Sequence, residues 1–158
     1  MTEDDQAAAI LASVVLRAND REIEAMTLEA IAHDPESTDL DASIRDASQS
    51  EARAGAFGME VAGALIVPIL IEAGRQFWKA YSEKLMEKAG EDLAGWTISK
   101  FKDWFLGAEN AEKSKVKNQL ADKIRSVGED RGLSSDDIDA ILATLSTENL
   151  SEALAATG

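Results

Sequence analysis

Thirty Asp and Glu side chains could in principle take part in acid–base catalysis or bind metal, but no pair of them stands out as a catalytic motif. The single histidine, His33, lies in an acidic stretch, whereas a metal site needs several donors that converge. Residues 134–139, Ser-Ser-Asp-Asp-Ile-Asp, could hold a divalent cation, but they lack the glycine and the distal glutamate of a calcium loop. Serine followed by aspartates is instead typical of a helix N-terminus. We therefore predict no catalytic, cofactor-binding or metal-binding residue, and no cofactor.

Phosphate-binding and thiol chemistry lack their motifs as well. The chain contains neither G-x-G-x-x-G nor a P-loop, and the glycines at 55, 58 and 63 lie in a helix-like run with no strand before them. The absence of cysteine excludes disulfides, thiol catalysis and cysteine-ligated zinc. We predict that the protein is not an enzyme and that it has no small-molecule substrate.

The charge is unevenly distributed along the chain. The net charge of −14 divides into −11 for residues 1–72, +3 for 73–127 and −6 for 128–158. Overall acidity argues against nucleic-acid binding, because phosphate contact needs a basic face. The N-terminus is acidic where an export signal would be basic, and no apolar segment follows it. We therefore expect a cytoplasmic location and no nucleic-acid partner.

Apolar residues recur at the helical spacing of three and four along most of the chain. Ile10, Leu11, Val14 and Val15 form one stripe. A second stripe marks a separate helix or a kinked continuation, and consists of Ile23, Met26, Ala30 and Ile31. Further helices are predicted over 110–127, from Ser134 or Ser135 onward, and around Leu150 and Leu154, whereas no strand pattern occurs.

The middle of the chain is apolar and aromatic. Ala54–Ile71 contains one charge, Glu60, and a helix-kinking proline, Pro68. Seven of the eight aromatic residues follow between 77 and 105. Their spacing predicts helices over 70–89 and 91–106, which the short connection at Gly90 joins as an antiparallel hairpin with facing aromatic stripes.

Together these patterns predict an all-α fold, a compact helical bundle of about five to seven helices with a central apolar helix and an aromatic helical hairpin. The expected organisation is a single domain in four parts. These are an N-terminal helical segment (1–33), an acidic linker (34–51), an apolar and aromatic helical core (52–127) and an acidic C-terminal helical segment (128–158).

The apolar and aromatic middle allows two functional interpretations beyond a purely structural core. Glycines at small-residue spacing let helices approach closely, which favours contact with a protein partner or a second copy. Aromatic residues next to lysines are instead typical of a membrane interface, and a positive middle suits anionic lipid. The candidate contact residues are Gly55, Gly58, Gly63, Leu65, Ile66, Ile69, Phe77, Trp78, Tyr81, Trp96, Phe101, Trp104 and Phe105.

Residues 61–105, VAGALIVPILIEAGRQFWKAYSEKLMEKAGEDLAGWTISKFKDWF, resemble small Gly/Ala-rich helical modules of bacterial conflict proteins, which act in antiphage defence and programmed death. Those modules pair an apolar, glycine-containing helix with an amphipathic helix rich in Lys, Trp and Phe. The resemblance covers under a third of the chain and implies an adaptor, oligomerisation or membrane-effector role.

The resulting hypothesis is a non-enzymatic interaction or self-association module that acts through 54–106, as an adaptor or effector in bacterial defence. The alternative is a membrane-active, pore-forming or membrane-perturbing effector whose apolar helix is masked, with conditional association with an anionic membrane surface. Glu60, Pro68 and the acidic flanks argue against a membrane-spanning role.

Overall fold

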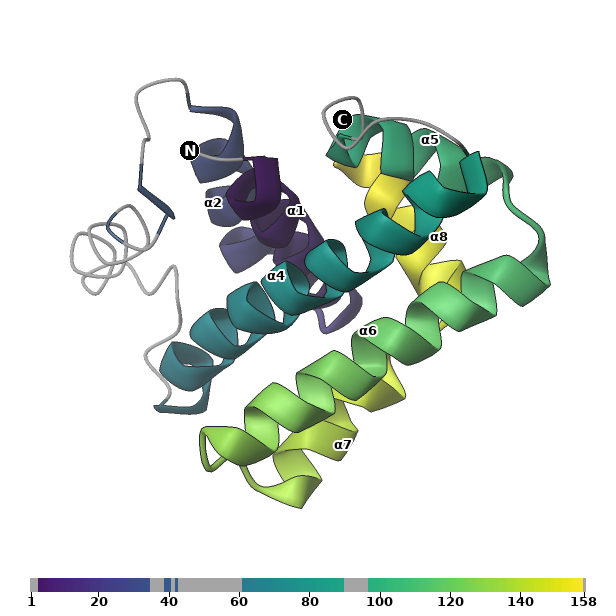
Figure 1. The fold of residues 1–158 in the computed structure, drawn as a ribbon. Helices are drawn as coiled ribbons and strands as arrows, with labels where there is room; N and C mark the ends of the chain where they lie inside the picture. The colour runs from purple at the N-terminus through teal and green to yellow at the C-terminus, as the bar shows by residue number, and fades with distance from the viewer. Residues whose placement is uncertain (1–2, 35–38, 41, 43–60, 90–96, 158) are drawn as a thin grey trace.

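The computed structural model describes residues 3–34, 39–40, 42, 61–89 and 97–157, and these residues form helices without any strand (Figure 1). The helices are α1 (Glu3–Ala18), α2 (Glu22–His33), α4 (Val61–Ala89), α5 (Ile98–Gly107), α6 (Asn110–Asp130), α7 (Ser135–Ala143) and α8 (Thr147–Ala156). The prediction of an all-α bundle is confirmed, with seven helices in the described part of the chain.

Helix α1 occupies the centre of the bundle. It packs against α2, α4 and α8 and also touches α5, and every residue from Ala7 to Leu16 is buried. The only polar member of this stretch, Ser13, donates its hydroxyl hydrogen to the Ile10 carbonyl at 2.6 Å, which satisfies the hydroxyl without an outside partner. A helix that is apolar on all sides is stable only when neighbours surround it, as they do here.

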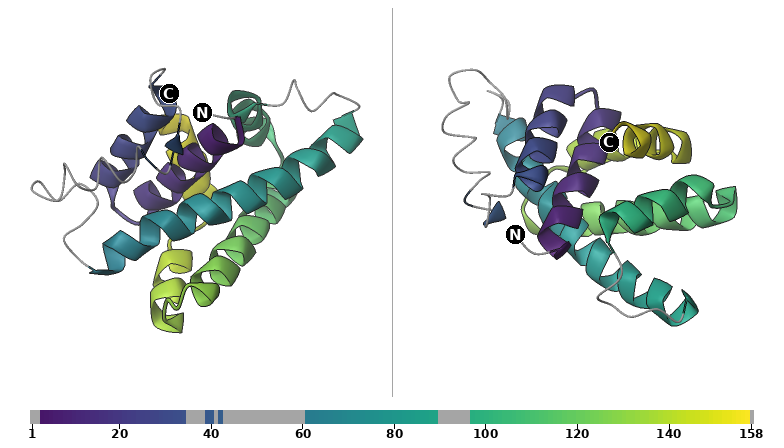
Figure 2. Two further views of the ribbon diagram at one scale, coloured as in Figure 1. Left: turned by 60° about the vertical axis from the view of Figure 1, so that its left-hand side comes forward. Right: turned by 90° about the horizontal axis from the view of Figure 1, so that it is seen from above.

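The apolar half of α4 shares the centre with α1. Ile66, Val67 and the run Ile69–Ile71 are buried, and α4 runs beside α1 in both views of Figure 2. Gly74 lies so close to α1 that an added Cβ would stand 3.1 Å from the Ala8 carbonyl oxygen. The close approach of α4 and α1 therefore depends on the glycine at position 74.

A turn separates α1 from α2. The sequence left open a kinked continuation or a separate second helix, and the structure has two separate helices. Asp20 adopts a positive φ of 60°, a conformation that Asp tolerates better than most residues. The Arg17 guanidinium then joins the two helices, because it donates to both carboxylate oxygens of Glu29 at 2.9 and 2.7 Å and to Glu22 at 3.1 Å. Such a paired geometry is the strong form of a charge-assisted hydrogen bond.

Helices α4 and α5 meet through aromatic rings, as the facing stripes predicted. Phe101 is the hub, with ring centroids 5.7 to 6.1 Å from those of five neighbours, namely Phe77, Trp78, Tyr81, Trp104 and Phe105. The predicted start of the second helix at Glu91 is wrong in one respect, because Thr97 has an extended backbone and caps a helix that begins at Ile98. Its hydroxyl accepts from the Lys100 amide at 3.2 Å. The predicted Gly90 connection lies outside the described residues.

The C-terminal helices follow the predicted pattern closely. The α6 residues Val116, Leu120, Ile124 and Val127 are buried. Helix α6 extends three residues beyond its predicted end, so Gly128 lies inside it, where an added Cβ would stand 3.1 Å from the Ile138 side chain.

The Ser134 hydroxyl caps α7 by accepting from the Asp137 amide at 3.2 Å. The acidic run 134–139 is therefore a helix N-terminus, as expected from its serine and aspartates.

One residue of the predicted acidic linker belongs to the core. Leu40 is completely buried, although its described neighbour Asp39 is exposed. Burial of a leucine side chain is worth roughly 1.5–3 kcal/mol, so Leu40 contributes to the stability of the core.

Candidate functional site

The sequence-predicted contact residues are mostly parts of the core. Of these residues, seven are buried, namely Ile66, Ile69, Phe77, Trp78, Tyr81, Phe101 and Phe105, whereas Trp104 is half-buried against them. Gly63 and Leu65 lie within α4, but their side chains are outside the described part, as are Gly55, Gly58 and Trp96 altogether. The described aromatic residues thus pack against one another, and their contact with a partner stays a prediction.

Tyr81 is a buried member of this aromatic cluster. Burial raises the pKa of the Tyr81 phenol to about 12, and the nearby Glu112 carboxylate adds to the increase. The adjacent rings of Phe77 and Phe101 lie 5.2 and 6.1 Å away between centroids. The Tyr81 phenol is therefore neutral below about pH 12, and its ring packs among the other aromatic side chains.

The outer face of α2 is the most exposed apolar surface among the described residues. Ile23 and Met26 have exposed fractions of 68 % and 57 %, and Ala30, one turn further along, is also exposed. Leu106, the other large exposed apolar residue of the described part, reaches 36 %. We call Ile23, Met26 and Ala30 the α2 stripe.

The α2 stripe corrects the sequence interpretation of this helix. The spacing of Ile23, Met26, Ala30 and Ile31 marked an apolar face, but of these four only Ile31 packs against the core. The buried apolar residues of α2 are instead Ala25, Leu28 and Ala32. Small side chains suit the face of α2 that packs on α1, because α1 is itself rich in alanine and two faces of small side chains can approach each other closely. Helix α2 therefore has apolar residues on both sides, which is unusual for a surface helix.

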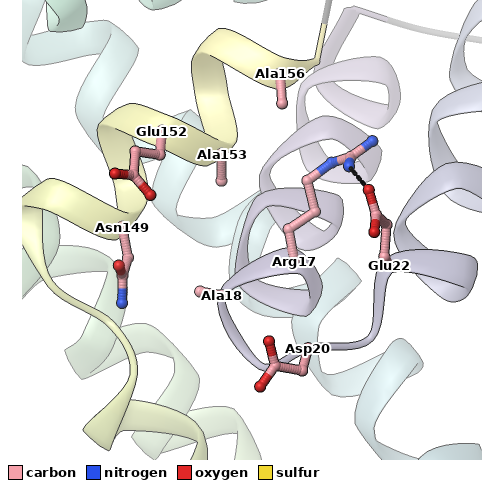
Figure 3. A pocket seen from close by; sticks show the side chains of 8 residues that line it. All are labelled: Arg17, Ala18, Asp20, Glu22, Asn149, Glu152, Ala153 and Ala156. Atoms are coloured by element: carbon pink, nitrogen blue, oxygen red, sulfur yellow. Dashed lines mark hydrogen bonds and ion pairs between the residues drawn. The ribbon is translucent and has the colours of Figure 1, made fainter.

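A cleft of about 460 Å³ lies between the α1–α2 turn and α8 (Figure 3). We call it the acidic cleft. Its walls come from opposite ends of the chain, and its lining residues are Arg17, Ala18, Asp20, Glu22, Asn149, Glu152, Ala153 and Ala156.

The cleft is acidic because Arg17, the one basic residue in its lining, is already paired with glutamates. The side chains of Arg17 and Glu29 are only 15 % and 14 % exposed, and hydrogen bonding to Glu29 raises the pKa of Arg17. Glu22 also binds Arg17, at 3.1 Å. Asp20 and Glu152 form no ion pair with any other described residue, so their charges face the cleft uncompensated.

A second groove, of about 380 Å³, lies between α4 and α6. It is lined by Phe77, Ala80, Gln119, Asp122, Lys123 and Ser126. Phe77 is almost completely covered, and Asp122 and Lys123 place opposite charges on the same wall. The lining of this groove therefore has no net charge with which to select a charged partner.

The described residues contain no group of three or more His, Asp or Glu side chains placed to hold a metal ion. In the same part of the chain, no helix combines the length and the apolar character needed to cross a bilayer.

The chain matches no protein-family model, and no curated protein or solved structure matches it either. The surface features of the molecule are therefore the basis for any functional proposal.

Proposed function

We propose that this chain is a non-enzymatic helical interaction module that associates with itself through the α2 stripe. The observation that carries the proposal is the exposure of Ile23 and Met26, at 68 % and 57 %. Isolated exposed apolar residues are common on monomers. Here, however, they align one helical turn apart with Ala30 on a helix whose opposite face is already buried, which is the arrangement expected of a helix that packs on both sides.

The polar residues at the two ends of α2 suit antiparallel pairing with a second copy. Helix α2 has glutamates in its first turn and His33 in its last. A twofold axis at the middle of α2, between residues 27 and 28, would place Glu22 of one copy opposite His33 of the other, and it would pair the helix dipoles in opposite directions. An interface with this symmetry uses the same patch on both copies, as a C2 dimer requires.

The association is expected to be weak. A twelve-residue helix offers one face, whereas a stable complex buries about 800 Å² on each partner. A dissociation constant on the order of 100 μM, about −5.5 kcal/mol, fits a contact of this size.

The sequence hypothesis placed the contact surface in 54–106, whereas this proposal places it on the α2 stripe. Its described aromatic residues, which are buried except for the half-buried Trp104, stabilise the bundle that presents α2. The resemblance of 61–105 to helical modules of bacterial conflict proteins supports an adaptor or effector role for such a module.

The membrane-active alternative stays a prediction. The apolar half of α4 is buried against α1, so membrane action would first require α4 to leave the bundle. Flotation with vesicles that contain anionic lipid tests this alternative, and protein that remains at the bottom of the gradient at low salt refutes it.

Sedimentation equilibrium over a wide concentration range tests self-association. We expect the wild-type chain to show a reversible monomer–dimer equilibrium and Met26→Glu to remain monomeric, because a buried unpaired charge at the centre of the contact is costly. Ala140→Glu is the matched control, since Ala140 is an exposed alanine on α7 and acquires the same charge. A wild-type chain that stays monomeric at several times the expected dissociation constant, on the order of 500 μM, refutes the proposal.

A further inference from the structure

We propose that the acidic cleft binds a lysine- or arginine-bearing peptide segment of a partner protein. This inference concerns a different surface from the α2 stripe and goes beyond self-association. It rests on the cleft's volume, on the charge of its walls and on the small side chains of its floor.

The cleft has the size of a binding site. A volume of about 460 Å³ falls within the roughly 300–1,000 Å³ that is usual for ligand sites. The side chains of α8 and of the α1–α2 turn leave this space open between them (Figure 3). An extended or helical segment that lies across it could insert one long side chain.

The charge of the walls selects a cation. Asp20 belongs to the α1–α2 turn and Glu152 to the facing side of α8, as Figure 3 shows. Arg17 cannot neutralise them, because its guanidinium is held by Glu29 and Glu22. A guanidinium or ammonium group that enters the cleft would meet carboxylates, those of Asp20 and Glu152, that have no other described ion pair.

The folding of the chain concentrates this charge. Residues 1–72 and 128–158 have net charges of −11 and −6, and the cleft is where helices from these two segments face each other. The attraction for a basic segment is therefore both local and long-range, which favours fast association at low salt.

The floor of the cleft allows close approach. Ala18, Ala153 and Ala156 contribute only methyl groups to the lining, so the backbone of a bound segment can come near α8 without a steric clash. Asn149 does not block this approach, since its amide already donates to the Thr144 carbonyl at 2.7 Å.

Fluorescence anisotropy with a labelled Lys/Ala helical peptide tests the inference, with a Glu/Ala peptide of equal length as the probe control. The double variant Asp20→Asn with Glu152→Gln removes both free charges. Asn keeps the tolerance for positive φ that position 20 requires. We expect its affinity for the basic peptide to fall about tenfold, since each exposed ion pair contributes modestly.

The matched control is the double variant Asp136→Asn with Glu148→Gln, which makes the same change in net charge at exposed positions outside the cleft. We expect this control to bind the basic peptide within about twofold of the wild type, in line with the small contribution of distant exposed charges. Equal weakening in both double variants would mean diffuse attraction to an acidic protein and would overturn the inference, as would the absence of binding at low salt.

Sedimentation of the same variants separates this inference from the proposed function. Removal of the cleft charges should leave the monomer–dimer equilibrium of the α2 stripe unchanged, whereas Met26→Glu should leave peptide binding unchanged. If the cleft variant instead loses self-association, the occupant of the cleft is a second copy of this chain, and the inference of a basic partner segment is wrong.

Discussion

Replacement of Gly74 by alanine tests the packing at the centre of the bundle. The Cβ atom would stand 3.1 Å from the Ala8 carbonyl oxygen and 3.2 Å from the Ala8 Cα, both shorter than an ordinary van der Waals contact. These are backbone atoms, so no side-chain rotation can relieve the contact. Helix α1 would have to shift as a whole, and α2 and α8 pack against it as well.

Two effects of opposite sign decide the magnitude. Alanine in place of glycine within a helix stabilises by about 0.5–1 kcal/mol, because the unfolded chain loses less entropy on folding. Overpacking of a tight core costs about 1–3 kcal/mol. We expect the steric cost to exceed the gain and the free energy of unfolding to fall by about 1–2 kcal/mol, or roughly 3–6 °C in Tm for a chain of this size.

Urea unfolding followed by tryptophan fluorescence measures this change, with the m-value as a check that the unfolded state is unaltered. Gly107→Ala is the matched control, because Gly107 ends α5 and an added Cβ there meets nothing within 4 Å. Its stability should stay equal to or slightly above that of the wild type. The reasoning is refuted if Gly74→Ala is as stable as the wild type or more stable.

Three further predictions concern the core and the Arg17–Glu29 ion pair. Near-ultraviolet absorbance follows the only tyrosine, Tyr81, and should show ionisation at about pH 12 in the folded protein rather than at the ordinary value of about 10. Because the folded state holds this proton more tightly, the free energy of unfolding should decrease as the pH rises from 10 to 12, and a native titration near 10 would contradict the burial of the phenol. Glu29→Ala should cost about 2 kcal/mol in urea unfolding, since it leaves the half-buried Arg17 with fewer partners, and an unchanged midpoint would contradict this. Phe101→Ala should cost about 3–5 kcal/mol through the loss of ring contacts, whereas Leu106→Ala, at an exposed position, should cost under about 1 kcal/mol by calorimetry, and similar losses in both would refute the central role of Phe101.

Local patterns in the sequence were enough to predict the helices and much of their inner surface. The helix predicted over 110–127 corresponds to α6, and Ser134 with the aspartates after it predicted the start of α7. These features are local, because the three- and four-residue periodicity and the capping serine act within one or two helical turns. The extended backbone of Thr97 was not predicted, because the residues before it in the sequence continue the apolar spacing of the helix that follows.

The surfaces on which both functional proposals rest were decided by the tertiary structure. Helix α2 has two apolar faces, and its neighbour α1 determined that Ala25, Leu28 and Ala32 are buried while Ile23 and Met26 face outward. Periodicity could not make this choice, because it ranks faces by hydrophobicity and not by fit to a neighbouring helix.

The acidic cleft depends in the same way on long-range packing. The sequence by itself determined that both ends of the chain are acidic. Only the packing of α8 against α1 brought Asp20 and Glu152 to the two sides of one cleft. Composition and helical period describe residues that are close along the chain, whereas a binding surface is made by residues that become neighbours only when distant helices bury their apolar faces together.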